Sequence, residues 1–128
     1  MLMGKQPQIS DAEWEVMKAL WQAAPVSVSE LTQRLKRDWH PKTVRTMLLR
    51  LQKKGVVASK VKDGVYQYFA TVTREECTRS AAHSFLDRVF DGALAPMVAH
   101  FVSGRGLTAD EKRELKKLLA SGSSEKKR

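Results

Sequence analysis

Five segments in the first 70 residues follow an order that few small folds share: three amphipathic helical patterns and then two β-prone runs. The two runs, VVASKVK and VYQYFA, are separated by Asp63-Gly64, a dipeptide typical of two-residue hairpin loops. With such a loop, alternation places Val57, Ser59, Val61, Tyr66 and Tyr68 on one face and Lys60, Lys62 and Gln67 on the other. Three helices followed by a hairpin predict a winged helix-turn-helix domain over residues 1–72.

Capping residues mark where the three helices begin and end. Two capping boxes open the first two helices, Ser10 with Glu13 and Ser27 with Glu30. Pro41 suits the first turn of the third helix, and Gly55 suits the position just after its end. Inside the third helix four apolar residues recur at helical spacing and predict its buried stripe: Val44, Met47, Leu48 and Leu51.

From residue 73 onward the pattern is purely helical, so the fold class expected for the whole chain is mainly α with a small β-hairpin. Capping boxes at Thr73 and Thr108 open the first and last of three short amphipathic helices. A segment this small rarely builds an adequate hydrophobic core alone. We therefore interpret residues 73–120 as a helical dimerisation module that buries its apolar sides against a second copy of the chain. Its expected contacts are Phe85, Val89, Leu94, Met97, Val98, Phe101, Leu115, Leu118 and Leu119. The tail at residues 121–128, SGSSEKKR, is expected to be disordered.

The positive charge is concentrated in one window. Between Arg34 and Lys62 there are ten Lys or Arg residues and a single acid, Asp38, while the remaining 13 basic and 13 acidic residues cancel. The formal net charge of +9 therefore lies in less than a quarter of the chain. A concentrated patch of this kind points to a polyanionic partner, with nucleic acid first and an acidic membrane surface second.

The exposed side of the third helix carries the residues best suited to contact DNA. They are Lys42, Thr43, Arg45, Thr46, Leu49, Arg50 and Lys53, and no acid is among them. In a helix-turn-helix the second helix of the motif enters the major groove, where Arg reads guanine, Thr contacts bases and Lys holds phosphates. We expect Lys60 and Lys62 on the hairpin to reach flanking phosphates. Lys54 also complements the helix dipole, and His40 is interpreted as a turn residue suited to a phosphate contact.

The cysteine content and the lack of long apolar segments indicate the cellular compartment. The single cysteine, Cys77, rules out an internal disulfide framework and suits a reducing cytosol. The N-terminus, MLMGKQPQIS, lacks the apolar run of a signal peptide, and no segment approaches about 20 consecutive apolar residues. We therefore expect a cytoplasmic protein without membrane insertion.

Four segments of the chain carry a resemblance to a known family. ISDAEWEVMKALW, VSVSEL, KTVRTMLLRLQKKG and the hairpin VYQYFA resemble the BlaI/MecI/CopY family of penicillinase-type repressors over roughly residues 9–120. The resemblance implies a homodimeric winged-helix repressor that binds a palindromic double-stranded DNA operator. In the BlaI and MecI branch it also implies a membrane sensor-protease that triggers cleavage of an Asn-Phe bond in the dimerisation module. Here the matching residues are His100 and Phe101, so the phenylalanine agrees and the histidine departs from the motif.

Catalysis and metal binding have little support in the sequence. Ser59-Lys60-Val61-Lys62 matches S-x-x-K, but that nucleophile motif needs a helical turn and these residues predict a strand. Cys77 alone is too few for the metal cluster of the copper-responsive branch, and the histidines lack partners at ligand spacing. We therefore expect no enzymatic activity, no metal and no cofactor. The alternative function is a winged-helix module that binds RNA or a protein partner without operator specificity.

Overall fold

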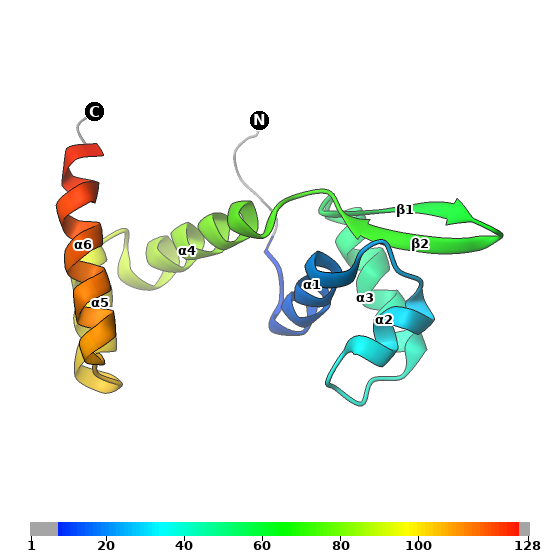
Figure 1. Ribbon diagram of the computed structural model, residues 1–128, viewed down its shortest axis with the longest axis horizontal. Coiled ribbons are helices and arrows are strands. Elements are labelled where there is room, and N and C mark those ends of the chain that lie inside the picture. Colours follow the sequence, from blue (N-terminus) through cyan, green and yellow to red (C-terminus); the bar gives the residue numbers. More distant parts are fainter. Residues whose placement is uncertain (1–7, 126–128) are drawn as a thin grey trace. The chain divides into compact units, whose positions relative to one another are not determined.

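The computed structural model describes residues 8–125, with side chains described through residue 121. The chain divides into two compact units, Met1–Ser84 and Phe85–Arg128, each described by itself below (Figure 1). The first unit holds α1 (Asp11–Ala23), α2 (Val28–Arg34), α3 (Pro41–Lys53), β1 (Val57–Lys62) and β2 (Val65–Ala70). The helix α4 (Arg74–Phe90) belongs to both units, and α5 (Leu94–Gly104) and α6 (Ala109–Glu125) belong to the second. This order confirms the winged helix-turn-helix predicted from the sequence.

The capping boxes that open α1 and α2 are both present. The Ser10 and Ser27 hydroxyls accept from the main-chain N–H groups of Glu13 and Glu30, whose carboxylates accept from the serine N–H groups in return. A helix of seven residues such as α2 is not stable alone in water. Its stability comes from this cap and from Leu31, which is completely buried in the core.

The helix α3 is fixed at both ends by the residues that the sequence indicated. Pro41 occupies its first turn, where a missing N–H loses no hydrogen bond, and His40 is its cap. Gly55 follows the last turn with φ +85°, a left-handed backbone that favours glycine. The predicted stripe of Val44, Met47, Leu48 and Leu51 is buried.

The hairpin has the register that a two-residue loop requires. Ser59 pairs with Tyr68 and Lys60 with Gln67, so the two faces are those predicted. Asp63 and Gly64 have φ values of +53° and +77°, as the turns favoured in hairpins demand. Val26 exchanges two main-chain hydrogen bonds with Tyr68, at 3.1 and 2.7 Å, which ties the segment before α2 to β2.

One hydrophobic core joins the elements of the first unit. Its buried members are Val16, Met17, Leu20, Val26, Leu31, Val44, Met47, Leu48, Leu51, Val56, Val57, Tyr68 and Cys77. The three tryptophans, Trp14, Trp21 and Trp39, are partly buried and pack against it. Trp14 and Trp21 lie with ring centroids 5.7 Å apart, and the Trp21 indole N–H donates to the carbonyl oxygen of Val72.

In the second part of the chain the capping boxes at Thr73 and Thr108 are again formed. The two units divide at Ser84, inside α4, whereas the sequence places the domain boundary before that helix. The helix α6 continues through residues 121–125, which the sequence assigns to a disordered tail. Propagation adds one hydrogen bond for each residue fixed, so an existing helix can continue into residues that would not start one, Gly122 included. The rest of the predicted tail, residues 126–128, lies outside the described residues.

Candidate nucleic-acid interface

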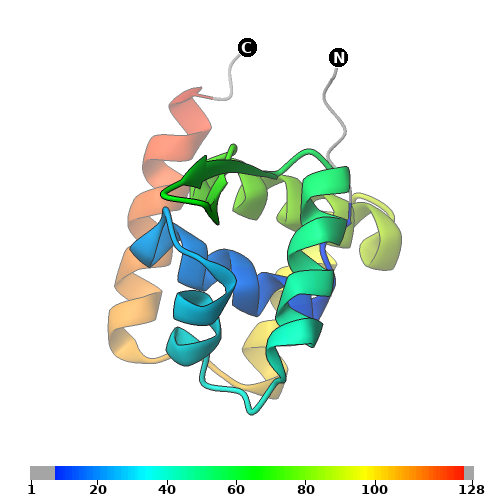
Figure 2. The ribbon, with the colours of Figure 1, turned by 90° about the vertical axis from the view of Figure 1, so that its right-hand side faces the viewer.

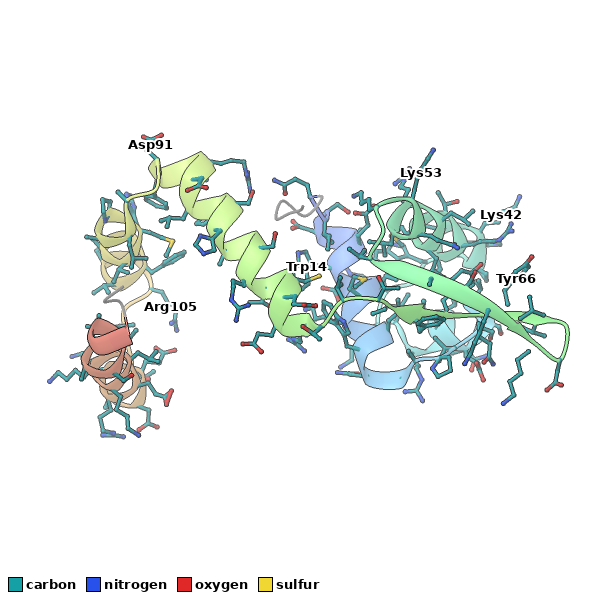
Figure 3. All side chains as sticks on the ribbon, turned by 90° about the horizontal axis from the view of Figure 1, so that it is seen from above. Trp14, Lys42, Lys53, Tyr66, Asp91 and Arg105 are labelled. Carbon is teal, nitrogen blue, oxygen red and sulfur yellow. The ribbon has the colours of Figure 1, made fainter. Side chains whose placement is uncertain are left out.

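The exposed side of α3 is a basic, acid-free surface. All seven predicted residues are exposed, opposite the buried stripe: Lys42, Thr43, Arg45, Thr46, Leu49, Arg50 and Lys53. Figure 3 shows Lys42 and Lys53 near the two ends of the helix, with side chains that project away from the ribbon. Within residues 8–121, the ion pairs of the structure use none of the four basic residues of this surface. We call this set the α3 basic face.

The N-terminal end of the α3 basic face is shaped by two local hydrogen bonds. The Nδ1 atom of His40 accepts from the N–H of Lys42 at 3.0 Å, so its other ring nitrogen remains available to a ligand. The Thr46 hydroxyl donates to the carbonyl oxygen of Lys42 at 3.0 Å. With its proton engaged inside the helix, Thr46 presents a methyl group and acceptor lone pairs outward.

The hairpin places further cations on the first unit. Lys60 and Lys62 are exposed and share one face, because they alternate with Val61 along β1. The Lys60 ammonium lies 5.9 Å from the centroid of the Phe69 ring, an interaction that restrains this side chain. In Figure 2 α3 and the hairpin both lie toward the viewer, on the same side of the first unit. The hairpin face toward α3 is the one that carries Ser59, whose hydroxyl accepts from the Gln52 side-chain amide at 3.3 Å, and Lys60 and Lys62 lie on the other face.

Two contacts in this region, one made by Arg37 and one by Lys54, were not predicted from the sequence. Arg37, in the turn before α3, lies 5.4 Å from the centroid of the Trp39 ring, a contact that aromatic and basic neighbours in a turn could have suggested. Lys54, although part of the basic run, does not point freely into solvent. Its ammonium lies 2.6 Å from Oε1 of Glu13 and donates to the carbonyl oxygen of Gln8 at 2.7 Å. No sequence signal links these residues, which are far apart along the chain.

The residues considered for chemistry are not assembled into a reactive site. Ser59 and Lys62 lie on β1, as predicted, so they project to opposite faces of the hairpin. Cys77 is buried, and its pKa is raised first by that burial and then by the charge of Glu76. Among residues 8–125 no group of three His, Cys, Asp or Glu side chains is placed to hold a metal ion.

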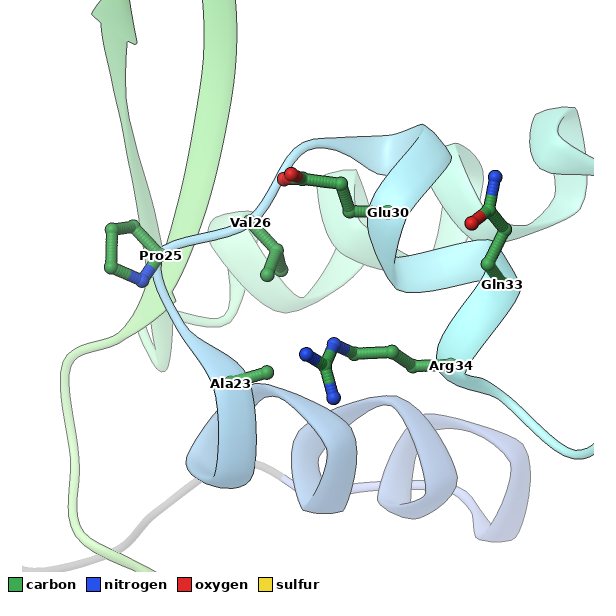
Figure 4. Close-up of a pocket in the computed structure, with 6 residues that line it drawn as sticks. All are labelled: Ala23, Pro25, Val26, Glu30, Gln33 and Arg34. Atoms are coloured by element: carbon green, nitrogen blue, oxygen red, sulfur yellow. The ribbon is translucent and has the colours of Figure 1, made fainter.

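A shallow pocket lies between the end of α1 and α2 (Figure 4). It is lined by Ala23, Pro25, Val26, Glu30, Gln33 and Arg34. Its polar groups are one carboxylate, already engaged in the cap of α2, one amide and one guanidinium. No hydroxyl, thiol or imidazole lines the pocket, and its one carboxylate accepts from the main-chain N–H of Ser27, so the pocket is not a candidate active site.

The second unit exposes the apolar residues predicted for dimerisation. Val89, Leu94, Val98, Phe101, Leu118 and Leu119 are exposed, and Phe85, Met97 and Leu115 are partly exposed. Phe101 is 53% and Leu119 71% exposed, although both are large apolar side chains. The two residues matched to the family cleavage site, His100 and Phe101, lie inside α5, and the His100 ring centroid lies 5.5 Å from that of Phe90.

The fold and this surface define a winged helix-turn-helix protein. The apo form of MarR from E. coli has a similar fold, with a TM-score of 0.51 and 24% sequence identity. The match covers 88% of this chain and 76% of the MarR chain. A family model described as the penicillinase repressor matches residues 9–121. The chain therefore belongs to the penicillinase repressor family. Among residues 8–125 we find no helix long and apolar enough to cross a membrane.

Individual relatives agree with this assignment. The penicillinase repressor of Bacillus licheniformis is 38% identical over 127 residues, which is 98% of this chain and 99% of the relative. The methicillin resistance regulatory protein MecI of Mammaliicoccus sciuri is 34% identical over 117 residues, 90% of this chain and 95% of the relative. The solution structure of monomeric B. licheniformis BlaI in complex with the blaP half-operator is 41% identical, with a TM-score of 0.50, over 58% of this chain and 93% of that chain.

Proposed function

We propose that this protein is a dimeric transcriptional repressor that binds a palindromic DNA operator through the α3 basic face. The observation that carries the proposal is the α3 basic face itself, which exposes four cations and no acid on a helix that a winged helix-turn-helix presents to DNA. The 41% identical BlaI domain solved in complex with a half-operator supports the same role. A repressor of this kind acts in the cytoplasm, where the DNA lies.

The side chains of the α3 basic face suggest separate roles. Arg45 and Arg50 are suited to guanine edges, and Thr43 and Thr46 to base edges and thymine methyl groups. The exposed Leu49 can pack only on apolar surface, such as a thymine methyl group. Lys42, Lys53, Lys60 and Lys62 are suited to phosphates, which position the protein on the duplex without reading sequence.

Dimerisation is supported by the apolar residues that the second unit exposes. Large side chains on two helices are each more than half exposed: Leu94 and Phe101 on α5, and Leu118 on α6. Monomeric proteins rarely expose large contiguous apolar patches, and a two-fold symmetric partner would cover these side chains. Two α3 helices about 34–36 Å apart would then occupy successive major grooves, so that the operator is palindromic and polymerase is excluded.

Relief of repression is proposed to occur by cleavage within α5. A cut between His100 and Phe101 would separate α6 and the end of α5 from the remaining chain. Without a dimer, the two half-sites bind independently and the gain in effective concentration is lost. The membrane sensor-protease implied by the family resemblance is the proposed partner for this step.

The test is selection of duplexes from a random library with the full-length protein, followed by titration of the selected duplex. We expect a palindromic selected sequence, a dimer by sedimentation, and much weaker binding by a chain truncated before residue 102. A protein that enriches no DNA sequence, or that binds single-stranded RNA more tightly than duplex DNA at every salt concentration, would contradict the proposal. That second outcome would favour the RNA-binding alternative.

A further inference from the structure

The C-terminal end of α3 contains two adjacent lysines in very different surroundings. Lys53 is exposed and belongs to the α3 basic face. The side chain of Lys54 is only 29% exposed, and its ammonium contacts Oε1 of Glu13 at 2.6 Å and the carbonyl oxygen of Gln8 at 2.7 Å. The Glu13 side chain is 3% exposed, so this is a largely buried ion pair rather than a surface contact.

Glu13 is itself held from a second direction. The same Oε1 atom accepts from the main-chain N–H of Ser10 at 3.0 Å, within the capping box that opens α1. The first turn of a helix is also where its dipole favours a negative charge. The carboxylate is therefore fixed to the start of α1, and Lys54 fixes the end of α3 to that point.

Further hydrogen bonds hold the same end of α3. The Val56 N–H donates to the carbonyl oxygen of Leu51 at 3.1 Å, and the Thr71 hydroxyl donates to that of Gly55 at 2.8 Å. At the other end, the cap on Lys42 comes from His40 in the preceding turn. The helix is therefore anchored to other elements by polar contacts mainly at its C-terminal end.

The length of α3 makes this anchor important for binding. A helix of 13 residues is about 20 Å long, so a rotation of about 10° about its anchored end displaces the other end by about 3 Å. Hydrogen bonds to base edges tolerate far smaller displacements than this. Phosphate contacts by long lysine side chains are more forgiving, because these side chains are flexible.

We infer that Glu13 and Lys54 are positioning residues of the DNA interface: their ion pair sets the direction of α3, and Lys54 makes no phosphate contact despite its place in the basic run. This inference rests on the proposed function. It separates two neighbouring lysines into different roles, Lys53 as a ligand of phosphate and Lys54 as part of the frame that orients the base-reading residues.

The experiment compares Lys54→Met and Glu13→Gln with Lys53→Met, which removes the same charge one residue away. Each full-length variant is titrated with the duplex selected by the wild-type protein and with a scrambled duplex of equal length, between low and high salt. Two quantities are measured: the preference for the selected duplex and the slope of log Kd against log salt. The preference is a ratio of two Kd values for the same sample, so it does not depend on the fraction of folded protein, and a loss of stability does not imitate a loss of positioning. Circular dichroism at each salt concentration checks that this fraction stays constant while the slope is measured.

For Lys54→Met and Glu13→Gln we expect the preference to fall about tenfold while the salt slope per bound protomer stays unchanged. For Lys53→Met we expect the slope to fall by about one and the preference to persist. A slope that falls equally for Lys54→Met and Lys53→Met would overturn the inference, as would an unchanged preference in Lys54→Met.

Should a single variant fail to fold, Glu13→Leu combined with Lys54→Met replaces the pair by apolar side chains, which buried ion pairs often tolerate. The same fall in preference is expected from this double variant. A wild-type protein that selects no sequence contradicts the proposed function instead, so the two failures are distinguishable.

Discussion

The Thr46 hydroxyl donates to the carbonyl oxygen of Lys42 at 3.0 Å, one turn earlier on the α3 basic face. The proton of this hydroxyl is thus used inside the helix, so Thr46 offers DNA a methyl group and acceptor lone pairs but no hydroxyl donor. The contact resolves an ambiguity in the sequence, where threonine could serve equally as a hydrogen-bond donor or as an apolar contact to DNA.

We expect the methyl to be the group that contacts DNA, so Thr46→Val, which retains it and loses the internal hydrogen bond and the acceptor lone pairs, should keep affinity for the selected duplex within about threefold. Thr46→Ala, which removes the methyl, should lower affinity by about fivefold or more, most for duplexes with thymine at one position. Titration against single-base variants of the selected duplex measures both. A larger loss in Thr46→Val than in Thr46→Ala would mean that the hydroxyl contacts DNA.

Arg45 and Lys60 should differ in the kind of binding they support. Arg45 is an exposed residue in the middle of the α3 basic face, whereas Lys60 lies on the hairpin. Arg45→Ala should cost about 1–3 kcal/mol and relax sequence choice at one operator position. Lys60→Ala should weaken all duplexes by a similar factor and lower the salt slope by about one.

Competition between the selected duplex and its single-base variants separates these outcomes. Uniform weakening by Arg45→Ala would show that this side chain holds phosphate rather than a base. A change in base preference caused by Lys60→Ala would place the hairpin in a groove.

The buried pair predicts a pH dependence of stability. Burial raises the pKa of Glu13, but the hydrogen bonds from Lys54 and Ser10 and the charge of Lys54 outweigh it, so the pKa lies below its ordinary value of 4.5. A carboxylate whose pKa is lowered by folding stabilises the protein above its unfolded pKa, and the stabilisation is lost as pH falls through the folded value. Glu13→Gln should therefore lower the free energy of unfolding by about 2 kcal/mol at pH 7, with a difference that shrinks below about pH 4.5.

Urea unfolding of wild type and variant between pH 7 and pH 3 measures this difference. Glu15→Gln is the matched control, because Glu15 lies on the same helix in an exposed pair with Lys18 at 3.6 Å. Exposed pairs of this kind contribute less than about 1 kcal/mol. Equal effects of the two substitutions at pH 7 would contradict the buried role of Glu13.

Local sequence signals account for much of the fold. Asp63-Gly64 predicts the register of the hairpin because its two residues adopt left-handed backbones, and Pro41 and Gly55 bound α3 through their own conformational preferences. These features depend on neighbouring residues along the chain. The exposure of Arg45 and Arg50 can also be predicted from the local sequence, because the apolar stripe of α3 determines which side of the helix is buried.

What the sequence could not predict depends on residues that are distant along the chain. Glu13 and Lys54 each have a sufficient local explanation, as a capping residue and as a partner of the helix dipole, so nothing in the pattern requires them to meet. The division of α4 at Ser84 is equally invisible, since the helical period continues across it. The Glu13–Lys54 contact and the division of α4 both follow from how the helices pack in three dimensions.

The proposed dimer should depend on single apolar residues of the second unit. Phe101→Ser removes an exposed aromatic side chain from each of two subunits, and at about 1.5–3 kcal/mol per side chain the dimer should weaken about 100-fold or more. Lys112→Ser, a change at an exposed polar position of α6, should leave the dimer intact. Sedimentation equilibrium measures both, and equal dimer stability in the two variants would remove Phe101 from the interface.

Cleavage at Phe101 should depend on protein concentration. The residue is exposed but lies inside α5, whose closed hydrogen bonds keep its peptide bonds out of the extended form that a protease binds. Local opening of α5 must precede a cut, and a partner that binds the closed form reduces the open population by mass action. Chymotrypsin should therefore cut after Phe101 slowly in the dimer and faster on dilution below the dimer dissociation constant. Mass spectrometry of the fragments separates cuts after Phe101 from cuts elsewhere in the same sample. A rate after Phe101 that does not depend on concentration would show that α5 opens equally in the monomer and in the dimer.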